Sequence, residues 1–128
     1  ITYFRKMSGK TVEIVGKVTD LELKTYYRKC TALIFPGVED FGLVMVEAQS
    51  FGKPVIAFKA GGATEIIKEG TTGVFFEKAN VTSLVNTLKL FDKKRYNGKD
   101  CIRNAERFSV ETFKKGIMNI LQRKEFLA

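Results

Sequence analysis

Short apolar runs alternate with segments of helical spacing over most of the chain. Runs rich in β-branched and aromatic residues predict four strands, at 12–15, 32–35, 55–58 and 74–76. Between these runs, apolar residues recur at three- and four-residue steps, which predicts helices over 21–30, 43–51 and 64–68. The predicted order is therefore β-α-β-α-β-α-β.

This alternation predicts an α/β fold within one domain, residues 1–128. Near-continuously apolar strands are typical of a parallel sheet covered by helices on both faces, and right-handed crossovers then favour a Rossmann-like arrangement. We expect about four parallel strands followed by a helical C-terminal tail. The predicted helices of the tail cover 81–91, 100–108 and 110–123. Thr82 or Ser83 can cap the first of them.

Composition and charge narrow the function without identifying it. The chain is 45% hydrophobic and 28% charged, which is ordinary for a globular domain, and its apolar runs are far shorter than the roughly 20 residues that cross a bilayer. Lys and Arg outnumber Asp and Glu by 22 to 14, and the net charge of +8 favours an anionic partner. The basic residues lack an interleaved aromatic pattern, so no specific nucleic-acid partner is indicated.

The chain contains no histidine, which excludes serine–histidine and cysteine–histidine hydrolysis within it and disfavours a transition-metal site. We therefore expect no metal, and any chemistry must use carboxylates, backbone amides, Lys or Arg. Cys30 and Cys101 lack metal-type spacing, which suits unpaired thiols in a reducing, cytoplasmic compartment. The chain starts at Ile1 without a methionine or a signal-peptide pattern, which indicates a fragment.

Two carboxylates flank a glycine at a predicted helix entrance. Glu39 lies in the loop after the predicted strand at 32–35, and Glu47 lies about one turn into the next helix. Ligands of open α/β sheets bind at the carboxyl ends of the strands, where the amides of Phe41, Gly42 and Leu43 can bond to a phosphate or a sugar hydroxyl. Carboxylates accept strong hydrogen bonds from sugar hydroxyls. From spacing alone, an exposed loop residue and a helix-surface charge are the simpler interpretation.

A series of motifs in fixed order extends over nearly the whole chain. They are Val15-Gly16-Lys17-Val18, Phe35-Pro36, the Glu39 and Glu47 pair around Phe41-Gly42-Leu43, Gly52-Lys53-Pro54-Val55-Ile56-Ala57, Gly61-Gly62 with Glu65, Glu69-Gly70-Thr71-Thr72-Gly73, and Arg107-Phe108-Ser109. In this series the chain resembles the C-terminal, donor-binding domain of the group 1 retaining glycosyltransferases. Members of that family have two facing Rossmann-like domains, the GT-B fold.

The resemblance implies that a sugar is transferred from a UDP- or GDP-sugar to an acceptor hydroxyl, with retention at the anomeric carbon. It assigns Glu39, the implied catalytic residue, to hydroxyls of the donor sugar and Glu47 to the ribose hydroxyls. The amides of Phe41, Gly42 and Leu43 would serve the sugar and the diphosphate. No metal or other cofactor is implied.

Other matching positions have structural explanations of comparable weight. Backbone groups at Val18 fall where the family contacts the nucleobase, but packing at a strand end explains this residue equally well. A tight turn before a helix accounts for most of the Gly61-Gly62 pattern and for Glu65. Phe51, Phe75 and Phe76 are expected in the core rather than in a stacking platform.

The family pattern also contains parts that this sequence lacks. Before the 12–15 run the family has a strand-helix-strand unit with a glycine-rich turn and an Arg/Lys pair that grips the diphosphate, and a separate N-terminal domain binds the acceptor saccharide or lipid. We therefore expect a truncated donor domain that binds donor weakly and transfers nothing alone. Its expected setting is cytoplasmic polysaccharide or glycolipid biosynthesis, with peripheral membrane association open.

Two other classes of function stay open at this point. One is a non-catalytic nucleotide-binding or interaction module with the same fold. The other is nucleic-acid binding driven by the charge of +8, which would weaken steeply with salt and show little preference for nucleotide sugars.

Overall fold

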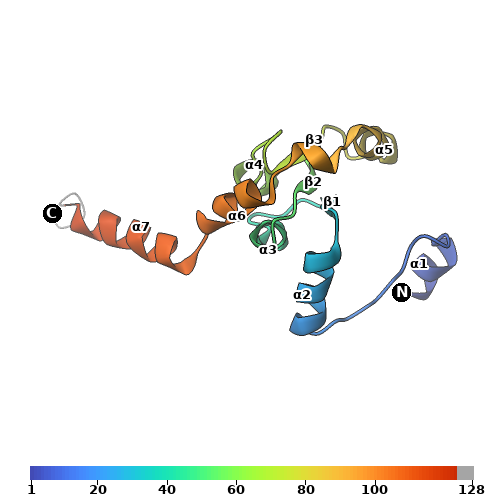
Figure 1. Cartoon of the computed structure of the whole chain (residues 1–128), viewed down its shortest axis with the longest axis horizontal. Coiled ribbons are helices and arrows are strands. Elements are labelled where there is room, and N and C mark those ends of the chain that lie inside the picture. The colour runs from blue at the N-terminus through green and yellow to red at the C-terminus, as the bar shows by residue number, and fades with distance from the viewer. Residues whose placement is uncertain (124–128) are drawn as a thin grey trace.

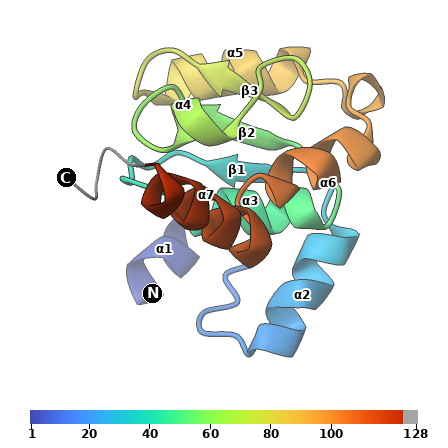
Figure 2. The same ribbon diagram turned by 90° about the vertical axis from the view of Figure 1, so that its left-hand side faces the viewer.

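The computed structural model describes residues 1–123, and a parallel three-stranded sheet lies at its centre. The strands are β1 (Leu33–Phe35), β2 (Val55–Phe58) and β3 (Gly73–Phe76), in the spatial order β1-β2-β3. Figure 2 shows them side by side, with β3 uppermost. Three of the four predicted strands are confirmed, each within one residue of its predicted ends.

Helices surround this sheet. In chain order they are α1 (Thr2–Met7), α2 (Asp20–Lys29), α3 (Leu43–Ser50), α4 (Ala63–Ile66), α5 (Val81–Leu90), α6 (Gly98–Glu106) and α7 (Val110–Gln122), with a 3-10 turn, η1 (Lys93–Arg95), after α5. In Figure 1, α3, α4 and α6 lie to the left of the strands and α5 to the right, so helices cover both faces. The predicted α/β, Rossmann-like class with a helical C-terminal tail is confirmed. The apolar pattern did not predict α1 or η1.

The predicted strand at 12–15 is wrong. Residues 12–18 form no strand, and Val12 and Val15 are 57% and 42% exposed. A β-branched run becomes a strand only where a neighbour supplies backbone partners, and the paired segments described in residues 1–123 do not include this one. The described sheet therefore has three strands instead of about four.

Side-chain caps explain where several helices begin. Thr19 and Glu22 form a capping box at α2, in which the Glu22 N–H donates to Thr19 Oγ1 at 3.3 Å and the Thr19 N–H donates to Glu22 Oε2 at 2.7 Å. The cap of α5 is Asn80, whose Oδ1 accepts from the Ser83 N–H at 2.8 Å. The predicted caps Thr82 and Ser83 are therefore wrong, because both lie inside the helix. Each such cap contributes roughly 1 kcal/mol.

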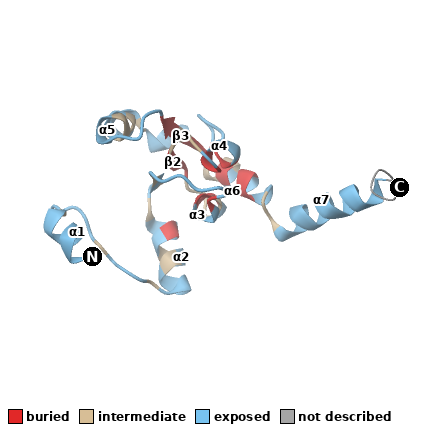
Figure 3. Ribbon diagram, turned by 180° about the vertical axis from the view of Figure 1, so that it is seen from behind, coloured by how far each residue is buried: buried red, intermediate tan, exposed pale blue. Residues whose placement is uncertain are grey.

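The core lies between the sheet and the helices α3, α4 and α6 (Figure 3). Residues with at most 1% exposure are Met45, Ala48, Gln49, Val55, Ile56, Ala57, Ala63, Ile66, Thr72 and Cys101. Phe75 and Phe76 are buried and Phe51 packs against the core, as predicted for these three aromatics. By contrast, α1 and α7 are exposed along their whole length (Figure 3). Within residues 1–123, no helix is long and apolar enough to cross a membrane.

A buried polar network joins α3, α4 and α6. Asn104 Nδ2 donates to Gln49 Oε1 and to the Ile66 carbonyl, both at 2.6 Å, and Asn104 Oδ1 accepts from Arg107 Nη1 at 2.7 Å. Gln49 and Asn104 are 0% and 2% exposed. Since these groups cannot turn to water, loss of one partner leaves the others unsatisfied at substantial cost. The network therefore fixes α6 against the helices beside the sheet.

Candidate functional site

The candidate site lies in the loop that joins β1 to α3, at the carboxyl end of the strands. Six consecutive residues line an open hollow of about 750 Å³: Val38, Glu39, Asp40, Phe41, Gly42 and Leu43. The hollow therefore brings together four of the six predicted site residues, namely Glu39 and the three whose amides were singled out. Sequence reasoning missed Val38 and Asp40, although Asp40 adjoins Glu39 in a polar loop at a strand end.

Unpaired backbone donors lie in this wall. Within residues 1–123, the N–H groups of Phe41, Gly42 and Leu43 bond to no protein acceptor, and the first backbone bond at the helix entrance runs from Met45 to the Gly42 carbonyl at 3.0 Å. Gly42 has a φ of 86°, and a Cβ there would collide with Met45 Cε. Because α3 has no side-chain cap, three donors remain available at the positive end of the helix dipole.

The glycine pair 61–62 packs against the backbone of the site loop. The Gly62 N–H donates to the Glu39 carbonyl at 2.7 Å. A Cβ on Gly61 would lie 2.5 Å from the same oxygen, and a Cβ on Gly62 would overlap the Phe41 carbonyl oxygen. The predicted tight turn before a helix is confirmed, since α4 follows at Ala63. The pair also sets the position of the loop that carries Glu39, which the sequence did not reveal.

The loop is also supported from the C-terminal motif. Phe108 meets the ring of Phe41 edge-on, with the ring centroids 5.7 Å apart and an interplanar angle of 83°. Arg107 lies over the Phe108 ring at 5.0 Å and its Nη2 donates to the Glu65 carbonyl at 3.4 Å. The Arg107-Phe108-Ser109 motif was noted in the sequence without a role. Through Phe108, the motif packs against Phe41, the aromatic residue that lines the hollow.

Glu47 lines a different cavity, of about 310 Å³, between α2 and α3. The other residues of its wall are Asp20, Leu23, Lys24, Tyr27 and Phe51. The Tyr27 hydroxyl donates to Glu47 Oε2 at 2.9 Å. Burial, together with the bond to Glu47, raises the pKa of Tyr27 well above its usual value, so the hydroxyl keeps its proton and remains a donor. The two predicted carboxylates therefore stand in the walls of two hollows, and sequence reasoning missed Tyr27.

Val18 is half-buried in the coil before Thr19, the N-cap of α2. It lines neither the hollow around Glu39 nor the cavity around Glu47. The structure therefore does not bring Val18 together with the other predicted site residues, and its contact with a nucleobase stays a prediction.

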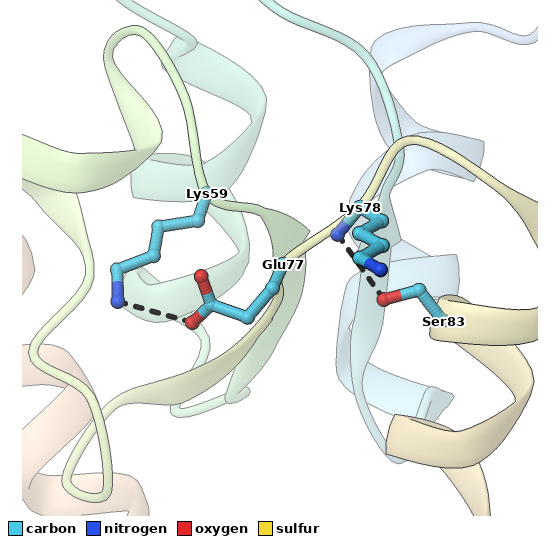
Figure 4. A network of polar contacts seen from close by, with 4 residues as sticks. All are labelled: Lys59, Glu77, Lys78 and Ser83. Carbon is cyan, nitrogen blue, oxygen red and sulfur yellow. Dashed lines mark hydrogen bonds and ion pairs between the residues drawn. The ribbon is translucent and has the colours of Figure 1, made fainter.

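The ionisable side chains around the first hollow are acidic. Glu39 and Asp40 line it, and no Lys or Arg of the described residues does so. After β2, Lys59 Nζ is paired with Glu77 Oε1 at 3.1 Å (Figure 4), and this bond raises the pKa of Lys59. The hollow therefore suits hydroxyl groups through its carboxylates, whereas an anionic group must be met by the backbone N–H donors.

One further contact lies just beyond the carboxyl end of β3. The Lys78 N–H donates to Ser83 Oγ at 3.2 Å, which joins the chain after β3 to α5 (Figure 4). Among the described residues, no group of three or more Cys, Asp or Glu is placed to hold a metal ion.

Comparison with known proteins identifies a family that the chain matches. Residues 6–108 match the model of a family described as glycosyl transferases group 1. An uncharacterised glycosyltransferase of Methanocaldococcus jannaschii is 32% identical over 119 residues, which are 87% of this chain and 33% of that protein. The D-inositol 3-phosphate glycosyltransferase of Thermobifida fusca is 32% identical over 102 residues, which are 76% of this chain and 24% of that protein.

Solved structures give the same result for the fold. Sucrose-phosphate synthase from Thermosynechococcus elongatus superposes on 99% of the chain and 33% of its own length, with a TM-score of 0.74 and 24% identity. The Anabaena protein HepE, solved in complex with UDP-glucose, superposes on 92% of this chain and 34% of its own, with a TM-score of 0.70 and 28% identity. The chain therefore spans about a third or less of the length of the proteins it matches.

Proposed function

The chain belongs to the group 1 family of glycosyl transferases, and we propose that it forms the donor side of a site that transfers a sugar with retention of its anomeric configuration. One observation carries this proposal. The hollow at the entrance of α3 combines two carboxylates with three backbone N–H groups that have no partner among the described residues. Such a wall suits a ligand that presents both hydroxyls and an anionic group. A nucleoside-diphosphate sugar is such a ligand.

In this proposal each predicted residue has one role. Glu39 accepts hydrogen bonds from hydroxyls of the donor sugar and is the catalytic residue of this chain. The N–H groups of Phe41, Gly42 and Leu43 bond to the sugar and to the diphosphate. Glu47 accepts from the ribose hydroxyls, and backbone groups near Val18 contact the base. The acidic wall supports the hydroxyl roles, because carboxylates bind hydroxyl donors strongly and repel phosphate.

The reaction breaks the bond between the anomeric carbon and the diphosphate oxygen, and that oxygen keeps the electron pair. The acceptor hydroxyl oxygen forms the new bond on the same face of the sugar, and its proton leaves with the diphosphate. The barrier falls when fixed dipoles meet the charge that develops on the leaving group, and one such donor is typically worth about 3 kcal/mol. In the proposal, the N–H groups of Phe41, Gly42 and Leu43, which bond to no acceptor within residues 1–123, supply this stabilisation, so that no metal is needed.

The donor is proposed to be a UDP- or GDP-sugar, and HepE, which was solved with UDP-glucose, is a similar structure. The acceptor, a saccharide or lipid, is proposed to bind to a region outside this chain, since the relatives are about three times as long or longer. We accordingly propose that the 128-residue chain transfers nothing alone. We also propose that the protein acts in the cytoplasm, in peripheral contact with a membrane that carries a lipid acceptor. The net charge of +8 supports this contact, because basic residues are attracted to the anionic lipids of the cytoplasmic leaflet.

A nucleotide titration tests the binding step. The amide NMR signals of Phe41, Gly42 and Leu43 are followed in the 128-residue chain as UDP-glucose, GDP-glucose or a short oligonucleotide is added at two salt concentrations. We expect these signals to move with one nucleotide sugar, and Glu39→Ala to weaken the effect at least tenfold while the other amide signals stay in place. Glu111→Ala, on the exposed helix α7, is the matched control and is expected to change nothing.

The same titration separates the other classes of function. Nucleic-acid binding would give an oligonucleotide response that collapses at the higher salt, without a response to nucleotide sugars. A non-catalytic module would also bind the nucleotide sugar, so transfer must be measured in a protein that also carries an acceptor-binding region. If this chain is non-catalytic, that protein shows no transfer, or its transfer is the same in Glu39→Ala and Glu47→Ala as in the wild type. Loss of transfer in both variants with retained folding supports the enzyme. Transfer by the isolated 128-residue chain would contradict the incomplete-site proposal.

A further inference from the structure

Tyr27 stands out as a buried side chain in direct contact with a residue of the proposed donor site. It belongs to α2, is 5% exposed, and lies 20 residues before Glu47 in the chain. Its hydroxyl donates to Glu47 Oε2 at 2.9 Å, and both side chains line the cavity of about 310 Å³ between α2 and α3. The bond is therefore made in the wall of a hollow, where a ligand can reach the same carboxylate.

The Tyr27 ring is itself held in place. It stacks on Phe51 with the ring centroids 5.6 Å apart and an interplanar angle of 20°, and Arg28 covers Phe51 at 5.5 Å from its centroid. Phe51 is the C-cap of α3, the helix that carries Glu47. The Tyr27 ring contacts Phe51 at the end of α3, and the Tyr27 hydroxyl contacts Glu47 within α3. These two contacts fix the position of the hydroxyl along α3.

An exposed glutamate samples several rotamers and loses that freedom when it binds a ligand. Glu47 is exposed, so an unsupported carboxylate would be poorly ordered before binding. The hydroxyl occupies one lone pair of Oε2 and leaves Oε1, and the remaining lone pair of Oε2, as acceptors. A carboxylate fixed in this way still accepts from two neighbouring hydroxyls, which is the number that a ribose presents at its 2′ and 3′ positions.

We infer that Tyr27 is a positioning residue for Glu47: its hydroxyl orients the carboxylate so that both ribose hydroxyls of the donor nucleotide are recognised. The inference rests on the proposed function, because it assumes that Glu47 binds the ribose. It adds a residue that acts through Glu47 and does not touch the reacting atoms. Its signature is selectivity for ribonucleotides over nucleotides without those hydroxyls.

The test compares two ligands that differ only in the hydroxyls. The dissociation constants of UDP and 2′,3′-dideoxy-UDP, and of the corresponding guanine pair, are measured by NMR titration of the 128-residue chain, which follows binding into the millimolar range. The wild-type chain is expected to prefer the ribonucleotide by about tenfold or more. Tyr27→Phe keeps the stacked ring and removes only the hydroxyl, and it is expected to lower this preference at least threefold without changing the affinity for the dideoxy ligand.

Three controls make the result specific. Tyr26→Phe removes a hydroxyl from the neighbouring residue of α2, whose side chain is 45% exposed, and it is expected to leave the preference unchanged. Glu47→Gln is expected to abolish most of the preference. In Tyr27→Phe combined with Glu47→Gln no further loss is expected, because the hydroxyl acts only through the carboxylate.

The outcomes separate the inference from the proposed function. If Glu47→Gln lowers the preference and Tyr27→Phe lowers the affinity for both ligands equally, the hydroxyl supports the fold only and the inference is wrong while the proposed function stands. If Glu47→Gln leaves the preference intact, or if the wild-type signals of Glu47 respond to neither nucleotide, the ribose role of Glu47 fails and the inference fails with it.

Discussion

Substitution of Gly62 by alanine tests how the site loop is held. Gly62 has a φ of −58° and a ψ of −24°, which alanine adopts without strain. The added methyl group nevertheless overlaps the Phe41 carbonyl oxygen and would lie 2.8 Å from the Asp40 carbonyl oxygen. Both obstacles are backbone atoms, so the loop or the start of α4 must move by about 1 Å to restore an ordinary contact. The hydrogen bond from the Gly62 N–H to the Glu39 carbonyl, 2.7 Å long, is strained by the same movement.

The cost of such overpacking is about 1–3 kcal/mol. For a chain of this length, that lowers the melting temperature by roughly 3–12 °C. Circular dichroism measures the melting temperature, and amide NMR shifts show whether residues 39–43 move. The matched control is Gly116→Ala in α7, where a Cβ meets nothing within 4 Å and helix propensity should stabilise the chain by up to about 1 kcal/mol. A Gly62→Ala chain that melts with the wild type and keeps its shifts at 39–43 would refute the proposed support of the loop.

Two further predictions concern buried groups away from the loop. Asn104→Ala removes the partner of Gln49 Oε1 and of the Ile66 carbonyl, and we expect a loss of roughly 2–4 kcal/mol in the free energy of unfolding by urea. Asn119→Ala, on exposed α7, should change it by less than about 0.5 kcal/mol, and equal losses would contradict the network. Burial raises the pKa of the Cys101 thiol to about 11 from an ordinary value of 9.0. Because the folded chain holds that proton more tightly, the free energy of unfolding falls as the pH rises from 9 to 11. Cys101→Ala should melt lower at pH 8 yet lose less across this range, and an unchanged slope would exclude a contribution from the thiol.

The sequence was sufficient for the elements whose signals are local. The runs at 32–35, 55–58 and 74–76 became β1, β2 and β3. β2 and β3 are largely buried, as their apolar composition indicates, whereas Ile34 of β1 is 44% exposed. Helical spacing found α2, α3, α5, α6 and α7 within about two residues, since each of these helices is long enough for an apolar stripe. The short helix α1 has no such stripe. The run at 12–15 has the composition of a strand but forms none, because a strand also requires a paired neighbour.

The site divides in the same way. Glycine at a helix entrance without an acidic or hydroxyl cap predicts N–H donors without partners, and those of Phe41, Gly42 and Leu43 bond to no acceptor in the part of the chain that the structure describes. That reasoning uses only neighbours in the chain. The separation of Glu39 and Glu47 into two hollows could not be read from their spacing, because the direction of each side chain depends on what packs beside it.

What the amino-acid sequence determined by itself is the alternation of strands and helices, the acidic loop and the glycine at the entrance of α3, because periodicity, chirality and backbone geometry act over a few residues. Only the tertiary structure decided that Gly61 and Gly62 pack against the loop that carries Glu39, and that the ring of Phe108 packs against Phe41. The same is true of the hydrogen bond that Tyr27 donates to Glu47. Each of these contacts joins residues about 20 to 70 positions apart. They exist because close packing around one sheet brings distant segments into van der Waals contact, and no local pattern encodes which atoms will meet.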